Sequence, residues 1–205
     1  MKIVAILLCM LTVMLPVAYG QTTTNTLTPA QCATLKTDII NDAALVNARN
    51  TRQDQVIADA YSAEATPVYW VWKSKLTRSQ MLYDTSVDNT FFSTSGTGFV
   101  TRTVQELMLF ESLFDKITSL TNPMNSVIRA SFGTAMSGGT SPAPENRTHM
   151  LAIARQKANR MERLFVDNTT QPCTGGTGNS PNGPCLMRYE GTVTTQHIAC
   201  ALNLP

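Results

Sequence analysis

Histidine and cysteine, the side chains that most often carry nucleophilic or metal chemistry, are few in this chain of 205 residues. Neither His149 nor His197 belongs to a group of Cys, Asp or Glu residues with the spacing of a metal site. A Cys–His nucleophilic pair would compete with disulfide formation, and no local signature supports one. We therefore predict no catalytic residues, no metal and no cofactor, and interpret both histidines as structural or exposed.

Five cysteines occur, and Cys9 lies in a segment that we predict to be removed. The remaining four are an even number, which is typical of disulfides in an oxidising compartment. Of the three pairings that four cysteines allow, we favour Cys173 with Cys185, which closes a short Gly/Pro/Asn loop. The second pair is then Cys32 with Cys200, which joins the first mature helix to the C-terminus. Four free thiols are the alternative, and the absence of a C-x-x-C pair argues against zinc.

One basic cluster stands out in a chain with 15% charged residues and a formal net charge of +2. Its members are Arg155, Lys157, Arg160 and Arg163, which we place on the outer face of a predicted helix over residues 145–166. A solvated helix face is the simplest interpretation, and contact with an acidic partner protein or with nucleic acid is the functional one. Because the net charge is so small, we do not expect nucleic acid as a partner.

An aromatic and β-branched segment, Thr66-Pro67-Val68-Tyr69-Trp70-Val71-Trp72-Lys73, contains both tryptophans of the chain. Pro67 favours an extended entry and the composition favours a strand, so we predict an extended crossing here. Together with Tyr69, the tryptophans Trp70 and Trp72 form a second candidate interaction surface.

Two triplets match the acceptor sequence for N-linked glycosylation: Asn146-Arg147-Thr148 and Asn168-Thr169-Thr170. Both fit an exported chain if its host is a eukaryote. Such triplets also arise by chance in sequence rich in Thr.

The N-terminus predicts export. A short basic start precedes an uncharged apolar run over residues 3–15, and Ala18 and Gly20 supply the small side chains that signal peptidase requires. The run is shorter than the roughly 20 residues that a membrane-spanning helix needs. We predict that residues 1–20 are a signal peptide cleaved after Gly20, with a retained signal anchor as the alternative. The mature protein is then secreted, extracellular or periplasmic, without membrane contact.

Apolar residues recur at helical spacing through most of the mature chain, and capping patterns mark several helix starts. The predicted helices begin near Thr28, Gln53, Thr77, Thr103, Val127, Glu145 and Gln196. Residues 84–98 are predicted to form a loop, and residues 189–194 a short extended piece. We expect a mainly α, single-domain, helical bundle-like fold over residues 21–205, with one or two short extended segments and a Gly/Pro-rich, disulfide-closed loop at 169–185.

Several modest motifs follow one another in a fixed order along residues 27–203. They are Leu27-Thr28-Pro29-Ala30-Gln31, the aromatic segment of residues 66–73, Val127-Ile128-Arg129-Ala130, the helical stretch 158–165 and Tyr189-Glu190-Gly191-Thr192-Val193. In this order the chain resembles small uncharacterised proteins encoded in the virion-gene clusters of tailed phages and prophages. The resemblance implies a virion-associated, head–tail or minor structural role and no catalytic residues. The signal peptide, the four mature cysteines and the Cys173–Cys185 segment depart from that family.

Three functions follow from these observations. We favour an exported, non-enzymatic structural or interaction protein with protein partners or self-association. A secreted binding module or effector that uses the basic helix face is the second hypothesis, and it predicts salt-sensitive binding. The third is a small secreted hydrolase, which requires a pocket that joins His149, Glu106 and Glu190.

Overall fold

The computed structural model of the protein describes residues 25–83, 104–115, 118, 120–135, 143–170, 172–178 and 182–203. The predicted signal peptide and the predicted loop at 84–98 lie outside these residues. The described chain is mainly helical, as the sequence predicts. Its helices are α1 (Pro29–Asn41), η1 (Ala43–Leu45), α2 (Val46–Asn50), α3 (Asp54–Ser62), α4 (Arg78–Tyr83), α5 (Val104–Ser112), α6 (Ser126–Ala135), α7 (Ala143–Ile153), α8 (Arg160–Leu164) and α9 (Thr195–Leu202).

Short antiparallel strand pairs lie between these helices, so the fold has small two-stranded sheets where the sequence predicted a helical bundle-like fold with one or two short extended segments. The strands are β1 (Trp70–Trp72), β2 (Leu76–Thr77), β3 (Leu120–Thr121), β4 (Arg155–Lys157), β5 (Val166–Asp167) and β6 (Leu186–Met187). They pair as β1 with β4, β2 with β3, and β5 with β6. None of the described helices is long and apolar enough to cross a membrane.

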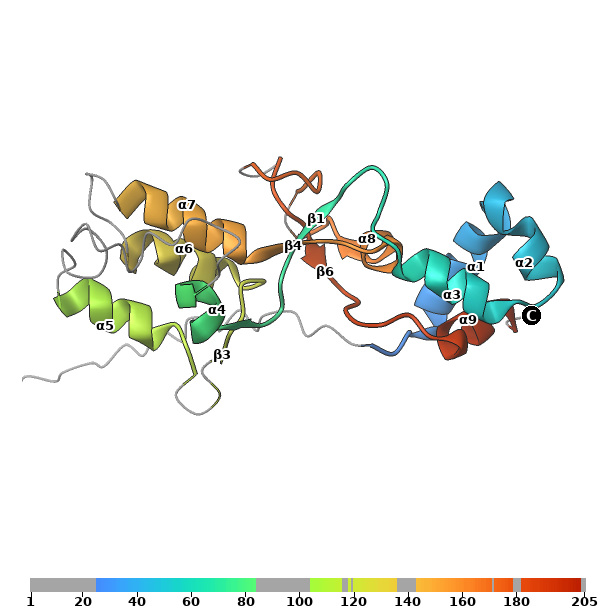
Figure 1. Ribbon diagram of the computed structural model, residues 1–205, viewed down its shortest axis with the longest axis horizontal. Coiled ribbons are helices and arrows are strands. Elements are labelled where there is room, and N and C mark those ends of the chain that lie inside the picture. Colours follow the sequence, from blue (N-terminus) through green and yellow to red (C-terminus); the bar gives the residue numbers. More distant parts are fainter. Residues whose placement is uncertain are drawn as a thin grey trace, which may run out of the picture.

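The helices gather at two ends of an elongated molecule (Figure 1). One end, which we call the N/C lobe, consists of α1, η1, α2, α3 and α9. The other end consists of α4, α5, α6 and α7, and we call it the middle lobe because these helices come from the middle of the sequence. Each lobe has its own hydrophobic core. Strands β1, β4 and β6 lie between the two lobes, together with α8.

The N/C lobe brings together the first and last described helices. Thr28 and Gln31 form a reciprocal capping box at the start of α1, as the sequence predicts. Leu35 and Ile39 are then four residues apart on one helix face, and both are buried. The disulfide between Cys32 and Cys200 joins α1 to α9, with a Cα–Cα distance of 5.7 Å.

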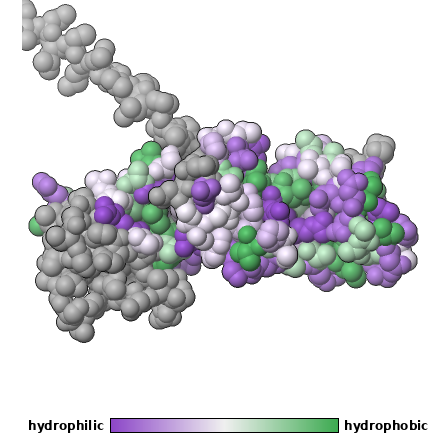
Figure 2. Space-filling view, turned by 90° about the horizontal axis from the view of Figure 1, so that it is seen from above, coloured by the Kyte–Doolittle hydropathy of each residue, from purple (hydrophilic) through white to green (hydrophobic). Residues whose placement is uncertain are grey.

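The middle lobe is organised around buried aromatic and methionine side chains. Phe110 of α5 packs edge-to-face on Phe114, and Phe132 of α6 and Met150 of α7 belong to the same cluster. On the surface, the described residues of one face mix hydrophobic and hydrophilic side chains without a dominant apolar area (Figure 2).

Strand β1 confirms the predicted extended crossing at residues 70–72 and holds three parts of the chain together. On one side it pairs with β4, with Val71 opposite Gln156. On the other side the Trp72 amide donates to the Cys185 carbonyl at 3.0 Å, and the Trp70 carbonyl accepts from the Cys185 amide at 3.0 Å. The backbone of β1 is thus bonded on both edges, and Val71 is fully buried.

The predicted helix over residues 145–166 is wrong in its second half. Helix α7 ends at Ile153, residues 155–157 form strand β4, and a new short helix, α8, begins at Arg160. Asn159 and Glu162 form a capping box that starts α8, a signal that periodicity alone did not separate from a continuous helix. The backbone of β4 finds its hydrogen-bond partners on β1, a pairing between residues far apart in sequence that overrides the local helical preference.

Candidate binding site

The four basic residues predicted for one helix face lie on two different elements. Arg155 and Lys157 belong to β4, whereas Arg160 and Arg163 belong to α8. A single basic helix face therefore does not exist. Because β4 pairs with β1, the basic residues and the aromatic residues of the sequence analysis meet in one region.

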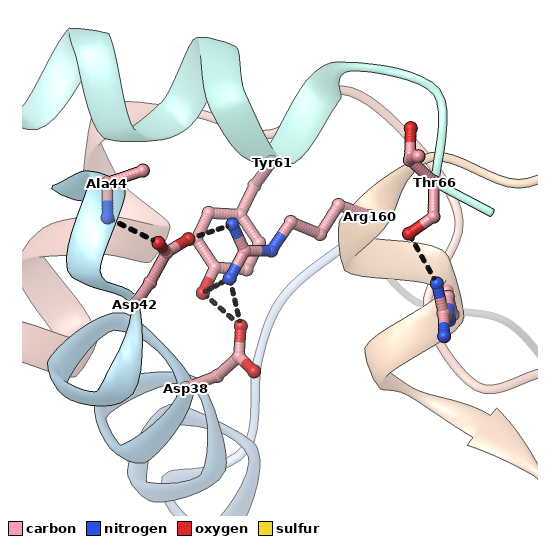
Figure 3. A network of polar contacts seen from close by, with 7 residues as sticks. Asp38, Asp42, Ala44, Tyr61, Thr66 and Arg160 are labelled. Atoms are coloured by element: carbon pink, nitrogen blue, oxygen red, sulfur yellow. Dashed lines mark hydrogen bonds and ion pairs between the residues drawn. The ribbon is translucent and has the colours of Figure 1, made fainter.

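Arg160 connects three helical segments of the N/C lobe (Figure 3). Its guanidinium pairs with Asp38 of α1 at 2.7 Å and with Asp42, the residue that caps η1. It also lies over the ring of Tyr61 from α3, with Cζ 4.3 Å from the ring centroid. These contacts make Arg160 a structural cross-link between α8 and the N/C lobe.

The Arg160 cluster shifts the proton affinity of its members. The hydrogen bond from Arg160 holds the pKa of Asp42 below its usual value. Burial raises the pKa of the Tyr61 hydroxyl, and the hydrogen bond that it donates to Asp38 raises it further. Both shifts favour the state of the cluster at neutral pH, in which Asp42 is ionised and the Tyr61 hydroxyl is protonated.

Lys157 and Arg163 contact neighbouring parts of the chain at the edge of this region. Lys157 pairs with Glu64 at 3.0 Å, and since both side chains are about half exposed the pair contributes little to stability. Arg163 donates to the Thr66 carbonyl at 2.9 Å and lies over the Tyr69 ring, 5.5 Å from its centroid. Both side chains are thereby held in one orientation near the surface.

Trp70 and Trp72 lie on the same face of β1, because alternate residues of a strand point the same way. Arg155 covers Trp70, with Cζ 5.2 Å from the ring centroid, and donates from Nη1 to the Thr177 carbonyl at 2.8 Å. Partial burial lowers the pKa of Arg155. A guanidinium has five N–H donors, and within the described residues Arg155 gives one hydrogen bond, to Thr177.

Arg129 of α6 covers Trp72, with Cζ 4.7 Å from the ring centroid. Its Nη1 donates to the carbonyls of Pro123 and Met124 at 2.6 and 2.8 Å. Burial lowers the pKa of Arg129 to about 10, so the side chain is still charged at neutral pH. The Trp72 indole nitrogen is buried and has no hydrogen-bond partner among the described residues.

These side chains surround a pocket of about 250 Å³, which we call the Trp72 pocket. Its described lining residues are Trp72, Arg129, Ala130, Leu151, Arg155, Pro172, Thr177, Gly178, Gly183 and Pro184. The described lining combines two arginines with apolar side chains and glycine backbone, and it includes no carboxylate. Such a pocket is suited to a negatively charged group that carries an apolar stem.

The outer wall of the Trp72 pocket is the Gly/Pro-rich loop predicted at residues 169–185. The Cys173–Cys185 disulfide closes it, with a Cα–Cα distance of 5.3 Å, and this is the pair that we favoured from the sequence. Gly175 has a φ of +72°, and a Cβ at this position would overlap the Tyr69 ring. The disulfide therefore closes the loop, and backbone hydrogen bonds that join Gly175 and Cys185 to β1, with the packing on Tyr69, hold its described part against this strand.

The glycosylation candidates and the histidines have different surroundings. Asn168 is exposed, but its Oδ1 accepts a hydrogen bond from the Cys173 amide at 3.0 Å, so it also orders the start of the loop. His197 accepts from the Thr194 amide at 3.0 Å and caps α9, a structural role. The side chains of Asn146 and His149 lie outside the described part of the chain.

Of the three residues named for the hydrolase hypothesis, Glu190 is the one whose side chain the structure describes. Glu190 accepts a hydrogen bond from Ser74, and the side chain of Glu106 lies outside the described part of the chain. Glu162, buried nearby, accepts from the Asn159 amide at 2.9 Å. Burial raises the pKa of Glu162, and the neighbouring Glu190 adds to the shift. Among the described residues no group of three or more His, Cys, Asp or Glu side chains is placed to hold a metal ion.

Sequence reasoning missed Arg129 and Thr177, which complete the pocket. Arg129 is a lone basic residue on α6, more than 50 positions from Trp72 along the chain, so no local pattern indicates their contact. Thr177 contributes a backbone carbonyl, which residue type does not reveal. The Gly-rich composition around Thr177 was the available signal, since glycine permits a close approach of the backbone.

Comparisons of this chain with protein-family models, with curated proteins and with solved structures found no match.

Proposed function

We propose that the protein is an exported, non-enzymatic interaction protein that binds a protein partner where β1 and β4 meet. One observation above all supports this proposal: three arginines cover the three aromatic side chains of residues 69–72. Arginine and tryptophan are enriched at the energetic centres of protein–protein interfaces. Side chains that are held in one orientation before binding lower the entropic cost of binding. Here the Cys173–Cys185 disulfide and the pairing of β1 with β4 hold the surface in place.

The two disulfides indicate an oxidising compartment, extracellular or periplasmic. Cleavage of a signal peptide after Gly20 is the route of export that we propose. Intact mass of the secreted protein tests it: the chain starts at Gln21, and four thiols become reactive to alkylation after reduction. A product that retains Met1 and is alkylated at four or more thiols without reduction contradicts export.

The resemblance to virion-associated proteins of tailed phages supports a structural role, head–tail or minor structural. The partner is then a second copy of this chain or another component of the same assembly. Tailed-phage virions assemble in the cytoplasm, whereas we propose that this chain is exported. We therefore propose that it keeps the interaction surface of such proteins but uses it outside the cytoplasm. A secreted binding module or effector that uses the same arginine-rich surface is the alternative.

Site-specific photo-crosslinking tests the proposed surface. A benzophenone amino acid replaces Thr177, an exposed residue at the rim of the Trp72 pocket, in the full secreted chain. The matched control replaces Thr37, an exposed residue of α1 in the N/C lobe. We expect illumination in the producing culture to give a discrete protein adduct from position 177 and not from position 37.

The identity of the adduct separates the alternatives. A crosslink to a second copy, or to another component of one assembly, supports the structural role. An adduct with an unrelated protein supports the binding module. Equal labelling from both positions, or none from either, contradicts a partner surface at β1 and β4.

A further inference from the structure

We infer that the Trp72 pocket binds the carboxylate-bearing side chain of an acidic protein segment. This inference rests on the proposed function and names the chemistry of the partner. Two arginines from different elements, Arg129 of α6 and Arg155 of β4, line one pocket with no carboxylate in its described lining. The described lining therefore carries positive charge, which favours an anionic ligand.

The Arg155 guanidinium is held in one orientation before any ligand binds. It is stacked on Trp70 and anchored to the Thr177 carbonyl, which leaves most of its donors unused among the described residues. A planar guanidinium held in one orientation matches the two oxygens of a carboxylate. Partial burial strengthens that interaction because the surrounding dielectric is lower than that of water.

The size and lining of the pocket decide between kinds of anion. At about 250 Å³ it is smaller than the roughly 300–1,000 Å³ of most small-molecule and cofactor sites, and it has room for one side chain. Leu151, Pro172 and Pro184 give it apolar walls, which suit the methylene stem of a glutamate. A nucleic acid, by contrast, is bound through extended arrays of cations and stacking aromatics, and both Trp72 of the pocket and the neighbouring Trp70 are already covered by arginine.

Tryptophan fluorescence gives a direct readout, because Trp70 and Trp72 are the two tryptophans of the chain and both belong to this site. The oxidised, full secreted protein is titrated with a pentaglutamate peptide, and calorimetry checks the affinity. A pentaglutamine peptide, inorganic phosphate and oligothymidine are titrated in parallel. We expect saturable binding of pentaglutamate, weakened by salt, and much weaker binding of the other three probes.

Two pairs of variants locate the binding. Arg155→Gln removes the partly buried guanidinium of the pocket, and we expect about tenfold or greater loss of affinity, whereas Arg52→Gln, at an exposed arginine of the N/C lobe, leaves it within about twofold. Ala130→Glu places a carboxylate on the exposed surface of α6 at the pocket wall, where it competes with the ligand. Ala130→Gln is its uncharged match and should bind normally. Because Ala130 is exposed and helical, this pair tests the site even if the arginine variant does not fold.

Unchanged affinity in both Arg155→Gln and Ala130→Glu overturns the inference, as does the absence of pentaglutamate binding. Equal or tighter binding of inorganic phosphate or of oligothymidine also overturns it, because the ligand would then not be a protein carboxylate. These failures are distinguishable from failure of the proposed function. A partner crosslinked at position 177 without pentaglutamate binding means that the surface is real and the chemistry assigned to the pocket is wrong.

Discussion

At the scale of single residues, four arginines connect different elements of this protein. Arg160, Arg163, Arg155 and Arg129 each lie over an aromatic ring and also bond to backbone carbonyls or carboxylates. A guanidinium can do both at once because its faces stack while its edges donate. Similar side chains thus have two roles, a structural cross-link at Arg160 and, as we propose, a binding surface at Arg155.

Substitution Arg160→Gln should lower the free energy of unfolding by about 1–3 kcal/mol, because Asp38 and Asp42 lose their shared cation and Tyr61 loses its stacking partner. Urea denaturation measures the change. Lys157→Gln is the control, since its ion pair with Glu64 is exposed on both sides, and we expect a change within about 0.5 kcal/mol. Equal effects of the two substitutions would contradict the structural role of Arg160.

The buried phenols predict a loss of stability at alkaline pH. Burial raises the pKa of Tyr189 to about 12, and the pKa of Tyr61 is raised as well, whereas an unfolded tyrosine titrates near 10. Between pH 10 and 12 the folded state therefore holds more protons than the unfolded state, and the free energy of unfolding falls as pH rises. Urea denaturation at several pH values should show this decline, with phenolate absorbance rising as the protein unfolds. Tyr189→Phe should reduce the slope, and an unaltered slope would contradict this assignment.

At the scale of elements, local signals located helix starts better than helix ends. The capping pair Thr77 and Gln80 is reciprocal in the structure, and α4 begins directly after it, as the sequence predicts. The break after Ile153 was not predicted, because the stabilising partner of β4 is a strand more than 80 residues earlier. For the same reason the candidate site was predicted only in halves: the aromatic segment and the basic residues were found, and their meeting was not.

Two glycine substitutions should change stability in opposite directions. Gly175→Ala requires a left-handed backbone and overlaps Tyr69, so we expect a loss of about 1–3 kcal/mol in the free energy of unfolding. Gly133→Ala lies within α6 with its nearest contact at 3.9 Å, and we expect a gain of about 0.5–1 kcal/mol. Thermal and urea denaturation of both variants check the signs. A neutral Gly175→Ala would mean that the loop is not packed on β1 as described.

At the scale of the whole molecule, the two disulfides have different tasks. Cys32–Cys200 spans 168 positions and fixes the N/C lobe, whereas Cys173–Cys185 spans 12 and fixes the wall of the Trp72 pocket. The shared strands between the lobes couple the two cores, so we expect residues 21–205 to unfold as a single domain.

Removal of each disulfide should separate stability from binding. Loop-closure entropy assigns about 5 kcal/mol to the long loop and about 3 kcal/mol to the short one, so Cys32→Ala with Cys200→Ala should destabilise the protein more. Cys173→Ala with Cys185→Ala should instead cost more affinity for pentaglutamate. Denaturation measures the stability of both double variants, and titration with pentaglutamate measures their affinity. If each variant lost stability and affinity to the same extent, this prediction would be contradicted.

The antiparallel pairing of β1 with β4 gives the chain a nested architecture. The Lys73 amide bonds to the Ala154 carbonyl at 2.9 Å, so the chain leaves for the middle lobe and returns from it at adjacent points of one ladder. Everything between these two residues is topologically an insert in a hairpin, and the N/C lobe is completed by the segments on either side of it. A loop inside this insert can therefore change in length without shifting the register of the β1–β4 ladder, whereas exchange of the whole insert would remove side chains that pack in one core with Val71 and Trp72.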